Sequence, residues 1–117
     1  MALALFAGIR VRELGAARTW YERLLGAPSF FPNATEVVWT LADDRSVYIE
    51  EVPDRAGSAL ITVWVDDLDA TVADIASRGL EPAERETYAN GVRKVIYRDD
   101  DGNEIGFGGE PAETESD

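Results

Sequence analysis

The chain has 117 residues, a length typical of one domain, and it contains neither cysteine nor histidine. Disulfides, thiolate or imidazole metal ligands and a cysteine nucleophile are therefore excluded. The formal charge of −12 argues against nucleic acid as a partner, because phosphate-binding surfaces need clustered Lys and Arg.

The N-terminal segment MALALFAGI is apolar and leads directly into the first predicted strand. It has no basic region and no cleavage site, so we expect no secretory or membrane-spanning segment, no membrane partner and a cytoplasmic location. At the other end, residues 110–117 are rich in Glu, Pro and Ser. This composition is typical of an acidic disordered tail, and it leaves residues 1–109 as a single domain.

The first half of the chain has the pattern of a strand, a helix and three further strands. Its predicted elements are a strand at 4–12, a helix at 15–25, a short strand containing Phe30 and Phe31, and strands at 36–41 and 47–51. In the first strand, Ile9 and Val11 alternate with Arg10, which indicates one buried face. Gly26 is placed to end the helix.

The second half repeats this order after a linker at residues 53–58. Its predicted elements are a strand at 60–65, a helix that ends at Arg78, and strands near 81–87, 92–98 and 104–108. Asp66 or Asp67 is placed to cap the helix, and Gly79 follows its end. The last two strands are joined by an Asp-rich turn that ends in Gly102 and Asn103.

The two halves are an internal duplication. Residues 9–26 and 61–79 share a strand–turn–helix–Gly pattern, in which Val11 corresponds to Val65. We therefore predict an α+β fold of two βαβββ modules in one chain, one at about 4–52 and the other at about 59–109.

Several segments of this pattern resemble the glyoxalase/bleomycin-resistance/extradiol-dioxygenase superfamily, also called the vicinal oxygen chelate fold. They are VREL (11–14), VDDL (65–68), WYERLLG (20–26) and RDDDGNEIGF (98–107). The resemblance implies mixed sheets curled around a concave pocket, with the helices outside. It also implies a homodimer, with the modules paired either within one chain or between two chains.

Enzymes of this superfamily hold a metal at four positions, which correspond by resemblance to Phe6, Glu50, Leu60 and Gly106 of this chain. Only Glu50 can coordinate an ion, so we predict no metal and no other cofactor at this place. A displaced cluster of carboxylates is the alternative, made of Asp99, Asp100, Asp101 and Glu104. The simpler interpretation is that these acids form a solvated hairpin turn.

The same resemblance places residue 60 in the pocket, and the alternation of side chains along strands then selects the other pocket residues. Trp39 is included if it pairs opposite Glu50, which depends on the length of the turn between their strands. The predicted ligand-binding residues are Phe6, Arg10, Trp39, Tyr48, Glu50, Leu60, Thr62 and Trp64. The wall is aromatic and apolar, with a few polar groups to orient a ligand.

These features favour a metal-free protein that binds a small organic ligand, either drug-like or a cationic aromatic compound, as bleomycin-resistance proteins do. A carboxylate beside Trp faces suits a cation. No catalytic residue is predicted. Two alternatives remain: an enzyme of the superfamily in which Glu50 acts as the general base, and an inert structural or regulatory module that only dimerises, which a cavity filled by Trp64 and Tyr48 would favour. For Arg10 and Glu50, the alternative to ligand binding is that they pair with each other.

Overall fold

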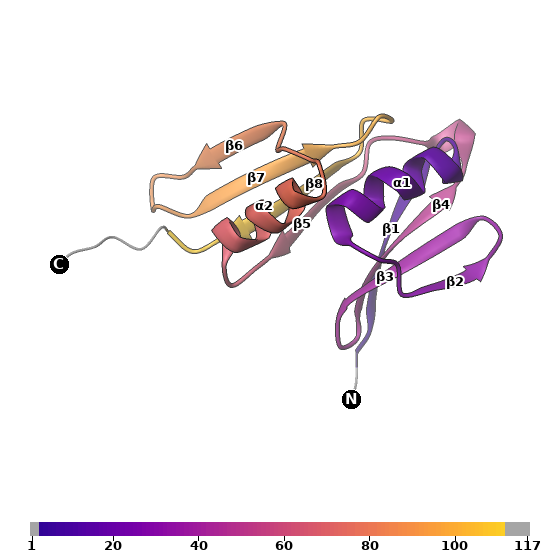
Figure 1. The fold of residues 1–117 in the computed structure, drawn as a ribbon, viewed down its shortest axis with the longest axis horizontal. Coiled ribbons are helices and arrows are strands. Elements are labelled where there is room, and N and C mark those ends of the chain that lie inside the picture. The colour runs from indigo at the N-terminus through magenta and orange to yellow at the C-terminus, as the bar shows by residue number, and fades with distance from the viewer. Residues whose placement is uncertain (1–2, 112–117) are drawn as a thin grey trace.

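The computed structural model describes residues 3–111, and it contains two modules with the same order of elements (Figure 1). The first comprises β1 (Leu5–Val11), α1 (Leu14–Leu25), β2 (Phe30–Asn33), β3 (Glu36–Ala42) and β4 (Arg45–Glu51). A short 3-10 helix, Pro53–Arg55, lies in the linker. The second comprises β5 (Leu60–Trp64), α2 (Leu68–Ser77), β6 (Glu84–Thr87), β7 (Arg93–Arg98) and β8 (Glu104–Gly109).

Each module forms one four-stranded mixed sheet, with the order β1-β4-β3-β2 in the first and β5-β8-β7-β6 in the second. The first strand of each module pairs in parallel with the last, and the other pairs are antiparallel. This arrangement confirms the predicted α+β fold of two βαβββ modules. Of the predicted tail, residues 112–117 lie outside the described part of the chain.

Both helices begin at the acidic residues that the strand-to-helix turns supply. The side chain of Glu13 accepts hydrogen bonds from the backbone N–H groups of Gly15 and Ala16, and Asp67 accepts one from Ala70. The glycine after α1, Gly26, adopts a positive φ of 88°, which a residue with a side chain rarely does. Within residues 3–111, no helix is long and apolar enough to cross a membrane.

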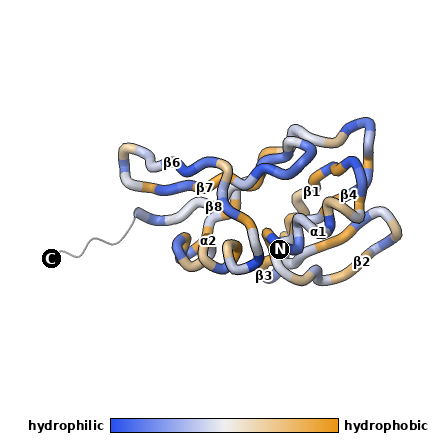
Figure 2. The backbone as a smooth tube through the Cα atoms, turned by 45° about the horizontal axis from the view of Figure 1, so that its top comes forward, coloured by the Kyte–Doolittle hydropathy of each residue, from blue (hydrophilic) through white to orange (hydrophobic). Residues whose placement is uncertain are grey.

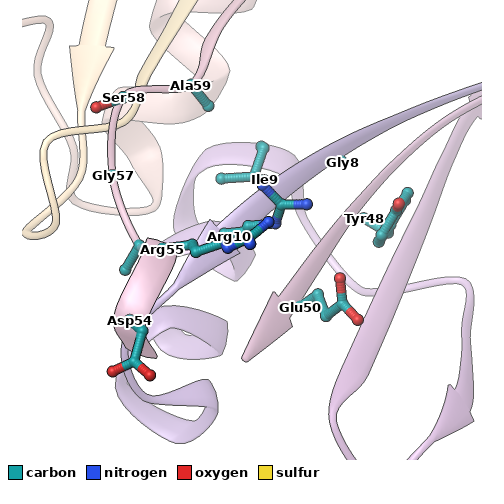
Figure 3. Close-up of a pocket in the computed structure, with 11 residues that line it drawn as sticks. Gly8, Ile9, Arg10, Tyr48, Glu50, Asp54, Arg55, Gly57, Ser58 and Ala59 are labelled. Carbon is teal, nitrogen blue, oxygen red and sulfur yellow. The ribbon is translucent and has the colours of Figure 1, made fainter. Parts of the chain in front are cut away.

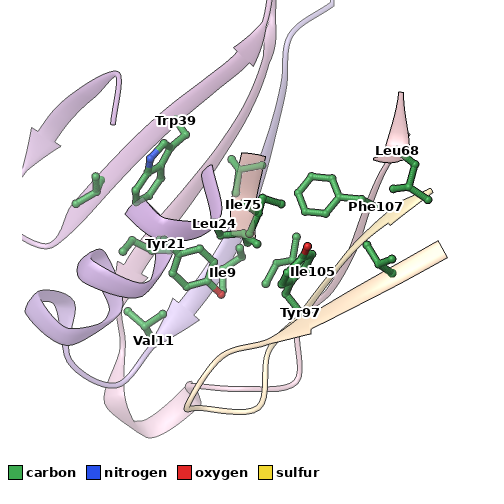
Figure 4. Packing of buried hydrophobic residues seen from close by; sticks show 14 residues of the cluster. Ile9, Val11, Tyr21, Leu24, Trp39, Leu68, Ile75, Tyr97, Ile105 and Phe107 are labelled. Carbon is green, nitrogen blue, oxygen red and sulfur yellow. The ribbon is translucent and has the colours of Figure 1, made fainter. Parts of the chain in front are cut away.

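One continuous core lies between the helices and the two sheets (Figure 4). Ile9 and Val11 of β1 are fully buried, and Ile105 and Phe107 of β8 meet them from the second module. The sheet face that carries these residues is covered by α1 and α2. The opposite face of each sheet carries no helix, and we call it the open face. The edge strand of the second sheet, β6, consists of hydrophilic residues (Figure 2).

Trp39 does not pair opposite Glu50, so the condition for counting it among the pocket residues fails. Trp39 pairs with Val47, while Glu50 pairs with Glu36, because the chain reverses through a tight turn at Asp43 and Asp44. Trp39 therefore points to the helix side rather than into the pocket. It is 2% exposed, and its indole N–H donates to the carbonyl of Gly26 over 2.8 Å.

A buried polar junction joins the two modules around Asn103, a residue of the β7–β8 turn. Asn103 has no exposed surface. Its Nδ2 donates to the carbonyl of Arg10 and to Asp99, both over 2.9 Å, and its Oδ1 accepts from the N–H of Ala59 over 3.0 Å. The hydroxyl of Tyr21 donates to Asp99 over 2.7 Å, and burial raises the pKa of this phenol well above its usual value. The turn is thus a structural joint rather than the solvated turn predicted from the sequence.

We predict that Asn103→Ala lowers the free energy of unfolding by about 2–4 kcal/mol, because it leaves the Ala59 N–H without its partner and removes the shorter of the two hydrogen bonds that the Arg10 carbonyl accepts, the other coming from the Gly57 N–H. Asn90→Ala is the control, since Asn90 accepts one backbone hydrogen bond in an exposed turn. It is expected to cost less than about 1 kcal/mol. Urea denaturation of both variants measures the difference, and equal losses would contradict the role of the junction.

Candidate functional site

A cavity of about 700 Å³ opens between the first module and the linker (Figure 3). Its floor comes from β1 and β4, which pair in parallel, and its rim from residues 54–59. The lining residues are Gly8, Ile9, Arg10, Tyr48, Glu50, Asp54, Arg55, Ala56, Gly57, Ser58 and Ala59. Arg10, Tyr48 and Glu50 are thus brought together, as the alternation of side chains requires.

The polar groups of this cavity carry both signs of charge. Arg10 and Glu50 are direct neighbours across β1 and β4, yet no ion pair joins them, and Glu50 is half-buried. The ring of Tyr48 lies over Gly8, where an added Cβ would be 2.7 Å from its hydroxyl oxygen. Glycine at this position therefore lets the phenol lie flat against the floor of the cavity.

The open face of the second module forms a separate surface. Leu60, Thr62 and Trp64 alternate along β5 on this face, while Ile61 and Val63 pack toward the core. Leu60 is 68% exposed and Trp64 is 54% exposed. The indole of Trp64 lies over Gly108 of the neighbouring strand, where an added Cβ would be 3.2 Å from Cε3. None of these three side chains lines the cavity of the first module.

The eight residues predicted from the sequence therefore fall into three places. Arg10, Tyr48 and Glu50 line the cavity; Leu60, Thr62 and Trp64 lie on the open face of the second module; Trp39 is in the core. Phe6 is 54% exposed and lies next to Ser46 on the neighbouring strand, at the far end of β1 from the cavity rim. Within one chain, the first two groups do not form a common pocket.

Sequence reasoning missed Lys94, which lies on the open face of the second module beside Trp64. Lys94 and Trp64 pair with the same residue, Gly108, from its two sides. The sequence did contain a feature that could have drawn attention to this residue, because Lys94 is the only lysine in the chain. Its orientation follows from the register of β7 against β8, which the sequence did not fix.

The donor set of this superfamily's metal site is not present in this chain. Of the four corresponding positions, Phe6, Leu60 and Gly106 offer no ligand atom, and Glu50 alone supplies a carboxylate. Asp99, which belonged to the alternative carboxylate cluster, already accepts hydrogen bonds from Tyr21, Asp101 and Asn103. Across residues 3–111, no group of three or more Asp or Glu side chains is arranged to hold a metal.

The fold and sequence together identify the family. The model of the Glyoxalase/Bleomycin resistance protein/Dioxygenase superfamily matches residues 3–107, so the chain belongs to this superfamily. No curated protein matches the sequence.

Three solved structures show the range of similar proteins. The glyoxalase/bleomycin resistance protein from Catenulispora acidiphila DSM 44928 is 54% identical, with a TM-score of 0.90 over 94% of this chain and 100% of that one. The antibiotic binding protein TnmS3 from Streptomyces sp. CB03234 is 22% identical, with a TM-score of 0.69 over 96% and 98%. The lactoylglutathione lyase from Agrobacterium tumefaciens is 16% identical, with a TM-score of 0.70 over 93% and 94%. The last two similarities show the fold alone.

We predict that Zn²⁺, Ni²⁺, Mn²⁺ and Fe²⁺ do not bind tightly at the position of Phe6, Glu50, Leu60 and Gly106, because one carboxylate supplies too few ligands. Isothermal titration calorimetry, under anaerobic conditions for Fe²⁺, is expected to show no stoichiometric sub-micromolar site. The control is Glu50→Ala, which should give the same isotherms as the wild type. Tight binding that disappears in Glu50→Ala would overturn this prediction.

Proposed function

We propose that the protein binds a small, drug-like aromatic compound without a metal. The observation that carries the proposal is the position of Trp64, whose indole is more than half exposed on a face with no helix above it. An exposed aromatic ring on a sheet surface offers a large contact area with little entropy to lose. The structurally similar TnmS3 is described as an antibiotic binding protein.

The cavity of the first module supports a ligand with a cationic part. Glu50 is half-buried there, beside the ring of Tyr48, and no ion pair neutralises its carboxylate. A carboxylate next to an aromatic ring attracts an organic cation through charge and through the ring face. Arg10 and Arg55 also line the cavity, where their guanidinium groups can donate hydrogen bonds to an anionic or carbonyl group of the same compound.

Binding is favoured over catalysis by the surroundings of Glu50. A general base works together with a second group that orients it or returns the proton. In the described part of the chain, the Glu50 carboxylate accepts no hydrogen bond from another side chain. The enzyme alternative therefore lacks a hydrogen-bonded side-chain partner for Glu50, although one protein of similar fold is described as a lactoylglutathione lyase.

The test is titration with a panel of glycopeptide, anthracycline and bleomycin-type antibiotics, followed by tryptophan fluorescence and calorimetry. For any compound that binds, Trp64→Ala is expected to weaken affinity by about 1–3 kcal/mol, because it removes an aromatic anchor. Its unfolding free energy should fall by less than the roughly 3–5 kcal/mol expected for a truncated core aromatic.

Trp39→Ala is the matched control for that experiment. Trp39 is buried, so its truncation should destabilise the fold by about 3–5 kcal/mol and leave the affinity of the folded fraction unchanged. If no compound of the panel binds, or if Trp64→Ala leaves every affinity unchanged, the proposed function is wrong.

We further propose that the ligand site is completed in a homodimer. Two features support this proposal: the molecule is elongated, at 53 × 37 × 25 Å, and apolar side chains such as Phe6, Leu60 and Trp64 are exposed on the open faces. A second copy that brings its first module against the second module of this chain would place the cavity of Glu50 opposite Trp64. A single ligand would then contact both groups of predicted residues.

We predict that sedimentation velocity at micromolar concentration gives about twice the chain mass of 12.8 kDa. Leu60→Glu should shift the equilibrium toward the monomer, since a partner over this face would bury the new charge at a high cost. Thr19→Glu, on the exposed surface of α1, is the control and should leave the mass unchanged. A monomer of 12.8 kDa for the wild type would contradict the dimer.

A further inference from the structure

The open face of the second module carries an unpaired cation in a strongly acidic protein. The chain has 23 acidic residues and one lysine, Lys94, which lies half-buried on β7. In the part of the chain that the structure describes, Lys94 forms no ion pair, whereas Arg93 and Arg98 on the same strand are paired with carboxylates. The ammonium group of Lys94 is therefore free to bind an anionic group from outside the chain.

The side chain of Lys94 extends toward β8 rather than toward its acidic neighbour on β6. Its cross-strand neighbour on β6 is Glu86, whose carboxylate accepts a hydrogen bond from the hydroxyl of Tyr88 over 2.9 Å. Lys94 turns instead over Gly106 of β8, where an added Cβ would lie 2.7 Å from its Cε. Glycine at 106 therefore provides the room that this lysine occupies.

Two further groups surround the same spot. The hydroxyl oxygen of Thr62 lies 3.6 Å from the position of a Cβ on Gly106, and it has no side-chain hydrogen-bond partner among residues 3–111. The indole of Trp64 lies over Gly108, which is the next residue of β8 on this face. An ammonium, a free hydroxyl and an exposed aromatic ring thus converge on the two glycines.

We propose that Lys94, Thr62 and Trp64 form a subsite for an aromatic compound with an anionic group, such as an aryl carboxylate. Lys94 supplies the charge and Thr62 a hydrogen bond to the anionic oxygens, while the aromatic part stacks on Trp64. The subsite rests on the proposed function, because it specifies which ligands the site prefers. In the proposed homodimer, a compound with both charges would place its cationic part at Glu50 of one copy and its anionic part at Lys94 of the other.

The test compares 2-naphthoate with its neutral isostere 2-naphthamide, using the wild-type protein labelled with ¹⁵N. Affinities are read from the shifts of the Trp64 indole N–H resonance. We expect naphthoate to bind at least about tenfold more tightly than naphthamide, which corresponds to about 1.4 kcal/mol. Lys94→Met should remove this preference, and Lys94→Arg should keep most of it because the charge remains.

The control is Arg23→Met, which removes one positive charge from the exposed surface of α1 and should leave the preference intact. The subsite is wrong if naphthoate and naphthamide bind equally to the wild type, if the preference survives in Lys94→Met, or if neither probe shifts the Trp64 resonance. Should the antibiotic titrations succeed while the naphthoate preference is absent, the subsite alone would fail and the proposed function would stand.

Discussion

The hydrogen bonds of Asn103 are the interaction on which the arrangement of the two modules depends. Arg10 lies near the end of β1 and Ala59 immediately precedes β5, so one buried amide fixes the corresponding first strands of both sheets. Tyr21 extends the junction to α1 through Asp99. Because the side chains of Asn103, Asp99 and Tyr21 are buried, removing one of them leaves buried polar groups of the others without a partner. The same junction holds the linker that forms the rim of the cavity.

With both helices packed on one side, the open faces are available for binding, and glycines shape them. Tyr48 lies over Gly8, Lys94 over Gly106 and Trp64 over Gly108. In each case a Cβ on the glycine would force the larger side chain away from the sheet. The open face thus has one long side chain laid across a strand in the first module and two in the second, which suits organic ligands better than a metal ion.

Much of the fold could be predicted from the sequence, because the signals were local and repeated. The duplication, the capping position at Asp66 or Asp67, and the glycines after the helices were enough to predict the order of the elements, whereas the cap at Glu13 emerged only from the structure. Trp39 was misplaced because the side of the sheet on which its indole lies depends on the register of β3 against β4. A turn that is one residue longer or shorter moves the side chain to the other side. Lys94 and Asn103 were missed for a related reason: sheet register and burial of a turn are properties of tertiary packing.

The central claim is that ligands bind on the open faces and not in the core or on the helices. The protein offers a direct test, since its three tryptophans lie in different places: Trp20 on α1, Trp39 in the core and Trp64 on the open face. With 5-fluorotryptophan incorporated, ¹⁹F NMR follows all three during titration with an antibiotic of the panel. We expect the Trp64 resonance to move in proportion to occupancy while that of Trp39 stays fixed. Movement of Trp20 or Trp39 with an unchanged Trp64 would contradict it.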